Sequence, residues 1–208
     1  MNKYIKKLNN FLINEISQLE NPLIVEFGVK NGISTNIFLD ICKKKNGKLF
    51  SIDIDDCSNV SKSNNWTFIK TRDDNFEFLE KKLPDQFDLI YLDTIHTANH
   101  VEKIFYHYYQ KLKINGLFII DDISWIPYVK DNYRNTFYCE INNQETFNRI
   151  LEIYRSNEKN FDLEFSFLDE GLAKIKKNNN NSLNLKRKIM SRKHSIKNLF
   201  RKINAGST

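Results

Sequence analysis

Apolar residues along the chain form short runs that alternate with segments where they recur at helical spacing. The runs lie at 23–27, 48–54, 66–71, 87–93 and 117–121, and the helical patterns lie between them at 34–45, 74–83 and 96–112. Nearly continuous apolar runs such as FDLIYL are typical of strands buried on both faces. Strand and helix in alternation predict an α/β domain, with a parallel sheet and helices on both faces.

The two ends of the domain have different patterns. A further helix is predicted near 144–155, and the segment 161–177 indicates two strands joined by a tight turn at Glu170–Gly171, which is an antiparallel hairpin. Residues 1–20 predict a packed amphipathic helix, because apolar residues recur there at helical spacing: Ile5, Leu8, Leu12, Ile16 and Leu19. A chain of 208 residues suits one such domain, which we place at 1–177.

Charge is distributed unevenly along the chain. The net charge is +6, but the segment from Gly171 to the end holds 11 of the 32 basic side chains and none of the 26 acidic ones. The first 170 residues therefore keep 21 basic and 26 acidic side chains and are mildly acidic. Residues 178–208 are predicted to form a loosely ordered basic tail that contacts polyanions or becomes helical on binding. The overall charge is no argument that the folded body binds nucleic acid.

Neither a membrane span nor a secretory signal is predicted. No uninterrupted apolar segment approaches the roughly 18 residues that a span requires, and Asn14 and Glu15 interrupt the N-terminal apolar pattern. The three cysteines are odd in number and widely spaced, so they indicate neither a disulfide framework nor a CxxC pair. A reducing cytoplasm is the simplest setting.

The first predicted strand runs into a glycine-containing turn, EFGVKNGIST, in which Gly28 and Gly32 are four residues apart and Ser34 opens a helix. Glycine permits a tight turn and lets backbone N–H groups approach a ligand at a helix N-terminus. The spacing is not GxGxxG, which weakens a dinucleotide interpretation, and GxxxxGK[ST] is absent. A plain strand-to-helix turn remains an alternative.

Acidic residues end the next two predicted strands. Asp53 stands 21 residues after Gly32, the distance at which a carboxylate accepts hydrogen bonds from ribose hydroxyls. The third strand is followed by Asp73 and Asp74, either of which is placed to meet an adenine amino group. One carboxylate of this kind is most often solvated, but acidic ends on successive strands after a glycine turn are unlikely to arise by chance.

These segments resemble the class I S-adenosylmethionine-dependent methyltransferases over roughly residues 20–177. EFGVKNGIST looks like the family's E/D-x-G-x-x-x-G motif, SIDID like its acidic second-strand motif, and EGLAKIKK like its closing hairpin. The resemblance implies a Rossmann-like, seven-stranded, mostly parallel sheet. It also implies that the glycine turn holds the methionine part of the cofactor. The implied cofactor-binding residues are Glu26, Gly28, Gly32, Ser34, Asp53, Asp73, Asp74 and Asp93.

The fourth predicted strand ends at Asp93 and the fifth at Asp121 and Asp122. In the resembled fold these strands are neighbours, and three converging carboxylates would repel one another unless a cation joined them. Oxygen ligands suit Mg²⁺, or Ca²⁺ and Mn²⁺, better than zinc. The pattern is similar to the metal-dependent branch of the family, which includes catechol and antibiotic-sugar O-methyltransferases. Alternatively, Asp121 binds substrate or caps a helix while Asp122 is solvated.

A divalent cation at this place would activate an acceptor hydroxyl, which is a poor nucleophile while it is protonated. His96, three residues after Asp93, is placed to collect the proton, so Asp93 and His96 are the predicted catalytic residues. The alternative for His96 is a capping or hydrogen-bonded role, and His100 is expected to be structural.

The sequence thus favours a metal-assisted O-methyltransferase that acts on a small hydroxylated acceptor, such as a sugar or glycan building block, alone or as a homo-oligomer. A rival of another class is a non-catalytic protein that keeps the fold and binds RNA, anionic lipid or a partner through its basic tail.

Overall fold

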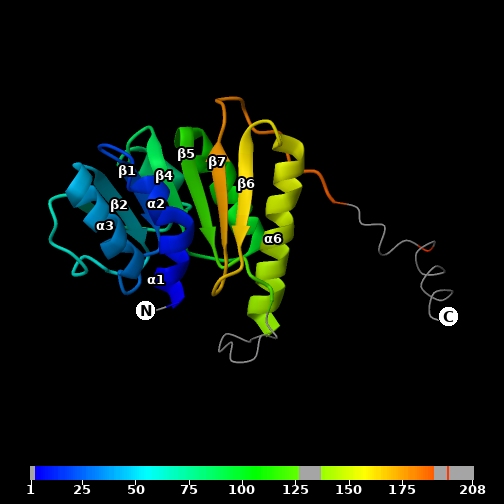
Figure 1. The fold of residues 1–208 in the computed structure, drawn as a ribbon, viewed down its shortest axis with the longest axis horizontal. Helices are drawn as coiled ribbons and strands as arrows, with labels where there is room; N and C mark the ends of the chain where they lie inside the picture. Colours follow the sequence, from blue (N-terminus) through cyan, green and yellow to red (C-terminus); the bar gives the residue numbers. More distant parts are fainter. Residues whose placement is uncertain (1–2, 127–136, 190–195, 197–208) are drawn as a thin grey trace.

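The structure is a computed structural model that describes residues 3–126, residues 137–189 and Ile196. Its centre is a seven-stranded sheet with the order β3-β2-β1-β4-β5-β7-β6 (Figure 1). The first five strands run parallel, and β7 is antiparallel to both β5 and β6. The strands are β1 (Leu23–Phe27), β2 (Lys48–Asp53), β3 (Trp66–Lys70), β4 (Phe87–Leu92), β5 (Leu112–Asp121), β6 (Phe161–Ser166) and β7 (Leu172–Lys177). The predicted fold class is confirmed.

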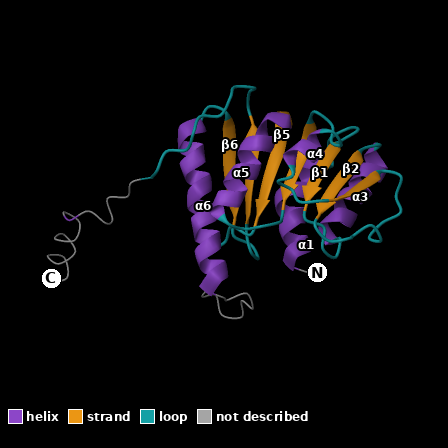
Figure 2. Ribbon diagram, turned by 180° about the vertical axis from the view of Figure 1, so that it is seen from behind, coloured by secondary structure: helices purple, strands orange, loops and turns teal. Residues whose placement is uncertain are grey.

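Helices cover both faces of the sheet. One face carries α3 (Ile33–Lys45) and an N-terminal helical run made of α1 (Lys3–Leu8), the π-helical turn η1 (Asn9–Ile13) and α2 (Asn14–Ile16) (Figure 1). The other face carries α4 (Phe76–Glu80), α5 (Ala98–Tyr108) and α6 (Phe137–Asn157), which lie in front of the strands in Figure 2. A short 3₁₀ turn, η2 (Tyr109–Lys111), connects α5 to β5.

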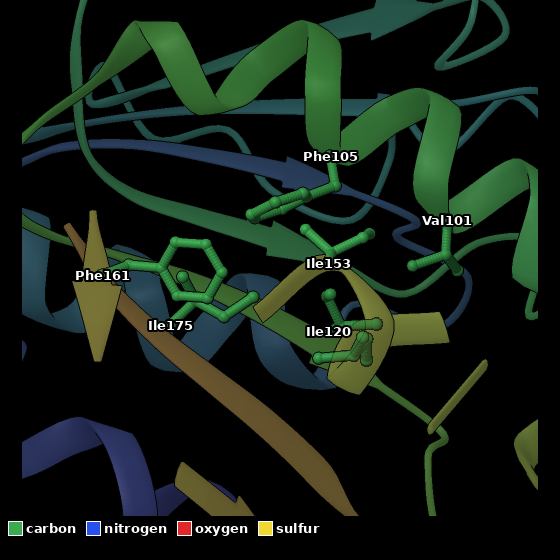
Figure 3. A pocket seen from close by; sticks show the side chains of 7 residues that line it. Val101, Phe105, Ile120, Ile153, Phe161 and Ile175 are labelled. Atoms are coloured by element: carbon green, nitrogen blue, oxygen red, sulfur yellow. The ribbon is translucent and has the colours of Figure 1, made fainter. Parts of the chain in front are cut away.

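The alternation of side chains along each strand divides the core into two layers. On β5, Ile119 packs with the N-terminal helices, whereas Ile120 packs with α5 and α6. The second layer is tight: no space for a water molecule remains among the side chains drawn in Figure 3, which come from α5, α6, β5, β6 and β7. This rigid support sets the positions of the strand ends.

The carboxyl ends of β1 to β5 lie along one edge of the sheet because these strands are parallel. Phe27 of β1 pairs with Leu92 of β4, and Leu92 pairs with Ile120 of β5. The residues that follow each pair are therefore neighbours in space. Open α/β sheets bind ligands in the crevice at this edge.

Residues 178–189, the first part of the predicted tail, lie against α5 and α6. The Tyr106 hydroxyl donates to the Asn184 carbonyl at 2.9 Å, and the Asn157 side chain both donates to that carbonyl and accepts from the Asn184 N–H. Lys186 forms an ion pair with Glu102 of α5. The structure thus differs from the expectation of loose order over 178–189, while the rest of the predicted tail, apart from Ile196, lies outside the described residues.

Among the described residues, no helix combines the length and the apolar composition that crossing a bilayer requires.

Candidate functional site

The glycine turn after β1 depends on both of its glycines. Gly28 has a φ of +97°, and a Cβ on it would lie 1.9 Å from the backbone oxygen of Asp93 at the end of β4. Gly32 has a φ of +71°, and a Cβ there would lie 2.2 Å from Cγ1 of Val60. The turn is therefore packed directly against the end of β4, and its backbone leads into the N-terminus of α3.

Glu26 braces this turn from the inside of the fold. Its carboxylate is fully buried and accepts hydrogen bonds from three hydroxyls, those of Ser34 (2.6 Å), Thr35 (2.8 Å) and Ser51 (2.7 Å). Burial raises the pKa of Glu26 to about 7, against the opposing effect of the three hydroxyl donors. Glu26 and Ser34, both predicted to bind the cofactor, contact each other beneath the turn, and their assignment to the cofactor stays a prediction.

Asp53 joins the end of β2 to the same turn. One carboxylate oxygen accepts from the backbone N–H groups of Val29 (2.7 Å) and Lys30 (3.0 Å), and the other accepts from the N–H of Asp55 (3.0 Å). Partial burial works to raise its pKa, but the backbone donors prevail and lower it. Asp53 is therefore an ionised acceptor at the crevice edge, where the sequence places the ribose.

The two acidic residues after β3 have different surroundings. Asp73 is buried and accepts from the Thr94 hydroxyl at 2.5 Å, and its carboxylate contacts His100 Nε2 at 2.7 Å. Asp74 pairs instead with Arg72 and Lys103 near the surface, and the hydrogen bond from Arg72 is the main reason that its pKa is lowered to about 2. Asp73 thus connects the end of β3 to the loop after β4.

The ends of β4 and β5 bring three of the predicted residues together. Nε2 of His96 lies 3.3 Å from a carboxylate oxygen of Asp122 and 3.6 Å from one of Asp93. One polar atom of each residue lies within 4.8 Å of the other two, and all three side chains are partly exposed. His96 precedes α5, and its carbonyl accepts a hydrogen bond from Thr146 of α6. Asp93, His96 and Asp122 are hereafter the acidic cluster.

Asp121 is not brought into the acidic cluster. Its carboxylate is almost fully buried and pairs with Nζ of Lys7 at 2.5 Å. Its second oxygen accepts from the Tyr91 hydroxyl, also at 2.5 Å. Consecutive strand residues point to opposite faces, and the chain takes a left-handed conformation at Asp122, with a φ of +57°. Only Asp122 of the two therefore reaches the side of Asp93 and His96.

Negative charge dominates the acidic cluster. Burial, followed by the charges of Asp121 and Asp122, raises the pKa of Asp93 well above its usual range. A divalent cation between Asp93 and Asp122 would reverse this effect. The donor set fits such an ion, because Mg²⁺ is commonly held by one or two carboxylates with water and substrate oxygens, and an imidazole is an acceptable further ligand for Mn²⁺.

Comparisons with known proteins agree with this architecture. Residues 25–123 match the profile of a family described as a methyltransferase domain. A search of curated proteins gave no match.

Solved structures with the same fold were found. The MycE methyltransferase from the mycinamycin biosynthetic pathway, in complex with Mg and SAH, has 19% identity and a TM-score of 0.60; the alignment covers 88% of this chain and 50% of MycE. A Staphylococcus aureus protein provisionally assigned as a caffeoyl-CoA O-methyltransferase has 19% identity and a TM-score of 0.62, with 85% and 84% covered. The SAH-bound Podospora anserina methyltransferase PaMTH1 has 15% identity and a TM-score of 0.61, with 80% and 76% covered. This chain thus spans half the length of MycE.

The sheet order, the glycine turn and the acidic strand ends define a protein with the class I methyltransferase fold. Residues 25–123, just under half of the chain, are similar to a methyltransferase domain.

The sequence prediction missed three residues that shape the site, which are Lys7, Tyr91 and Thr94, and it did not anticipate that His100 contacts Asp73. Lys7 stands beside the apolar positions of the N-terminal helix, but nothing in the local pattern links it to a residue 114 positions later. For Asp121 and Asp122 a signal was present, because the period of two along a strand separates adjacent side chains.

Proposed function

We propose that the protein is a divalent-metal-assisted O-methyltransferase that acts on a small hydroxylated acceptor, such as a sugar or glycan building block. The observation that carries the proposal is the acidic cluster: two carboxylates and an imidazole from the ends of neighbouring parallel strands, within 4.8 Å of one another at the ligand-binding edge of the sheet. Support for the metal also comes from MycE, a similar structure in complex with Mg.

Asp93 and Asp122 are the proposed ligands of the cation, with Mg²⁺ the expected ion. The cation would lower the pKa of an acceptor hydroxyl and fix its line of approach. His96 is the proposed acceptor of the hydroxyl proton, because its Nε2 lies beside both carboxylates that would hold the cation. S-adenosylmethionine would supply the methyl group: its methyl carbon would bond to the acceptor oxygen as the bond from that carbon to the sulfonium sulfur breaks, which leaves S-adenosylhomocysteine.

The cofactor is proposed to lie between the glycine turn and the ends of β2 and β3. The backbone near Gly28 faces the methionine part, Asp53 accepts from the ribose hydroxyls, and Asp73 or Asp74 meets the adenine.

Calorimetric titration with Mg²⁺ and Mn²⁺ tests the metal site directly. Asp122→Asn keeps the size of the side chain but removes its charge, so we expect cation affinity to fall at least tenfold, about 1.4 kcal/mol, while S-adenosylmethionine affinity is kept. Asp85→Asn is the matched control, because Asp85 is an exposed aspartate just before the amino end of β4. A wild-type protein without cation affinity would contradict the proposal.

An acceptor screen with hydroxylated sugars and phenols, with and without EDTA, then tests turnover. His96→Gln should lower the rate roughly 10²–10⁴-fold and leave cation affinity intact if His96 is the base. Loss of cation affinity in that variant would make His96 a ligand instead. Full activity in excess EDTA would refute the metal role. Binding of S-adenosylmethionine without turnover on any acceptor would favour the non-catalytic alternative.

A further inference from the structure

Lys7 is a fully buried lysine, an uncommon placement that requires a compensating partner. It lies at the end of α1, just before the π-helical turn η1, with its neighbour Leu8 packed in the core. Its ammonium contacts Asp121, whose side chain is 1% exposed, at the end of β5. The N-terminal helix thus carries a positive charge to the inner side of the proposed metal site.

A chain of contacts connects this ion pair to the acidic cluster. The Tyr91 hydroxyl, which donates to Asp121, lies 2.8 Å from the Tyr4 hydroxyl, and Tyr4 donates to Asp93 at 3.2 Å. On the other side, the backbone N–H of Asp122 donates to the Asp121 oxygen that Lys7 holds, at 2.7 Å. Both carboxylates of the cluster are therefore tied to the Lys7–Asp121 pair.

The pair also sets the charge near the cluster. When all three are ionised, Asp93, Asp121 and Asp122 carry three negative charges, and Lys7 neutralises the one on Asp121. Two carboxylates remain, which match the charge of one divalent cation. Both oxygens of Asp121 are occupied by protein donors, so neither is directed to an ion beside Asp122.

We propose that Lys7 is a positioning residue of the methyltransferase site: it withholds Asp121 from the cation and thereby restricts the carboxylate ligands of the cation to Asp93 and Asp122. The N-terminal helix is then an integral part of the site. This inference rests on the proposed metal-assisted function, and it concerns two residues that the fold brings together from α1 and from the end of β5.

The test is a double-mutant cycle on the full-length chain, in which calorimetry measures the Mn²⁺ affinity of each variant. Lys7→Met removes the ammonium and releases the Asp121 carboxylate, so cation affinity should rise about tenfold. Asp121→Asn leaves the ammonium unpaired beside the cation, so affinity should fall about tenfold. The double variant Lys7→Met/Asp121→Asn should return to within about threefold of the wild type.

An ion pair that acts only on the stability of the fold, with no electrostatic effect at the acidic cluster, would leave cation affinity unchanged in both single variants. Lys6→Met is the matched control, because Lys6 is the exposed neighbour on the same helix, and it should leave affinity unchanged. If Lys7→Met fails to fold because it leaves a buried charge unpaired, the double variant still decides the matter, since it removes both charges. It should bind Mn²⁺ about tenfold more tightly than Asp121→Asn.

Equal Mn²⁺ affinity in Asp121→Asn and the double variant would overturn the inference. This failure is distinguishable from failure of the proposed function. If the wild type binds Mn²⁺ and Asp122→Asn does not, the metal site stands and only the role of Lys7 falls. If the wild type binds no cation, the proposed function is overturned, and the role of Lys7 with it.

Discussion

Replacing Glu26 with Gln should make the stability of the protein less dependent on pH. The fully buried carboxyl has a pKa of about 7 instead of its ordinary 4.5. At about 1.4 kcal/mol for each pH unit, this rise corresponds to about 3 kcal/mol. Between pH 4.5 and 7 the folded protein holds a proton that the unfolded chain releases. The free energy of unfolding of the wild type therefore falls as pH rises through this window and levels off above pH 7.

The side-chain amide of the Glu26→Gln variant would remain neutral at every pH, and the three hydroxyls around it can rotate to accept from its N–H groups. Urea denaturation at a series of pH values from 5 to 8, followed by circular dichroism, measures the difference. We expect the free energy of unfolding of Glu26→Gln, relative to the wild type, to rise by about 2 to 3 kcal/mol over this range. Glu158→Gln removes the same charge from an exposed position of the chain and serves as the control.

A difference between Glu26→Gln and the wild type that stays constant with pH would refute this reasoning. It would show that the hydroxyls of Ser34, Thr35 and Ser51 keep the carboxylate ionised in the folded protein despite its burial.

Three further predictions concern the cofactor region and the C-terminus. Gly28→Ala should lower stability by about 2 kcal/mol or more in thermal or urea unfolding, because its Cβ would meet the Asp93 oxygen at a positive φ; an unchanged melting temperature would contradict this packing. Asp53→Ala should weaken S-adenosylmethionine binding by about 1–3 kcal/mol in calorimetry, and equal affinity, or a preference for NAD, would argue against the cofactor assignment. A chain that ends at Lys177 should melt at a lower temperature than the full chain, because it lacks Asn184 and its hydrogen bonds with Asn157. A chain that ends at Ile189 keeps these hydrogen bonds and should melt at the same temperature as the full chain.

The fold could be predicted well from the sequence, because the patterns that identify its strands, helices and turns lie within short segments of the chain. The apolar runs gave β1 at Leu23–Phe27 and the hairpin near Gly171, and parallel strands necessarily bring their carboxyl ends to one edge. Asp93 and Asp122 could be placed at that edge for the same reason. The buried pairings could not be predicted, because each joins residues distant in the sequence, and no pattern near Asp121 indicates that its partner is Lys7.

The N-terminal helix has one further consequence, for the order in which the protein folds. Its Glu15 pairs with Lys174 of β7, 159 residues later, and Lys7 pairs with Asp121. During synthesis the first helix is made long before either partner strand exists, so it cannot dock in its final place until almost the whole domain has emerged. Until then the helix lacks both of these ion pairs, although Leu8 and Leu12 belong to an apolar cluster that includes Phe38 of the early element α3. Such contacts between distant parts of the chain slow folding, and completion of the site coincides with completion of the domain.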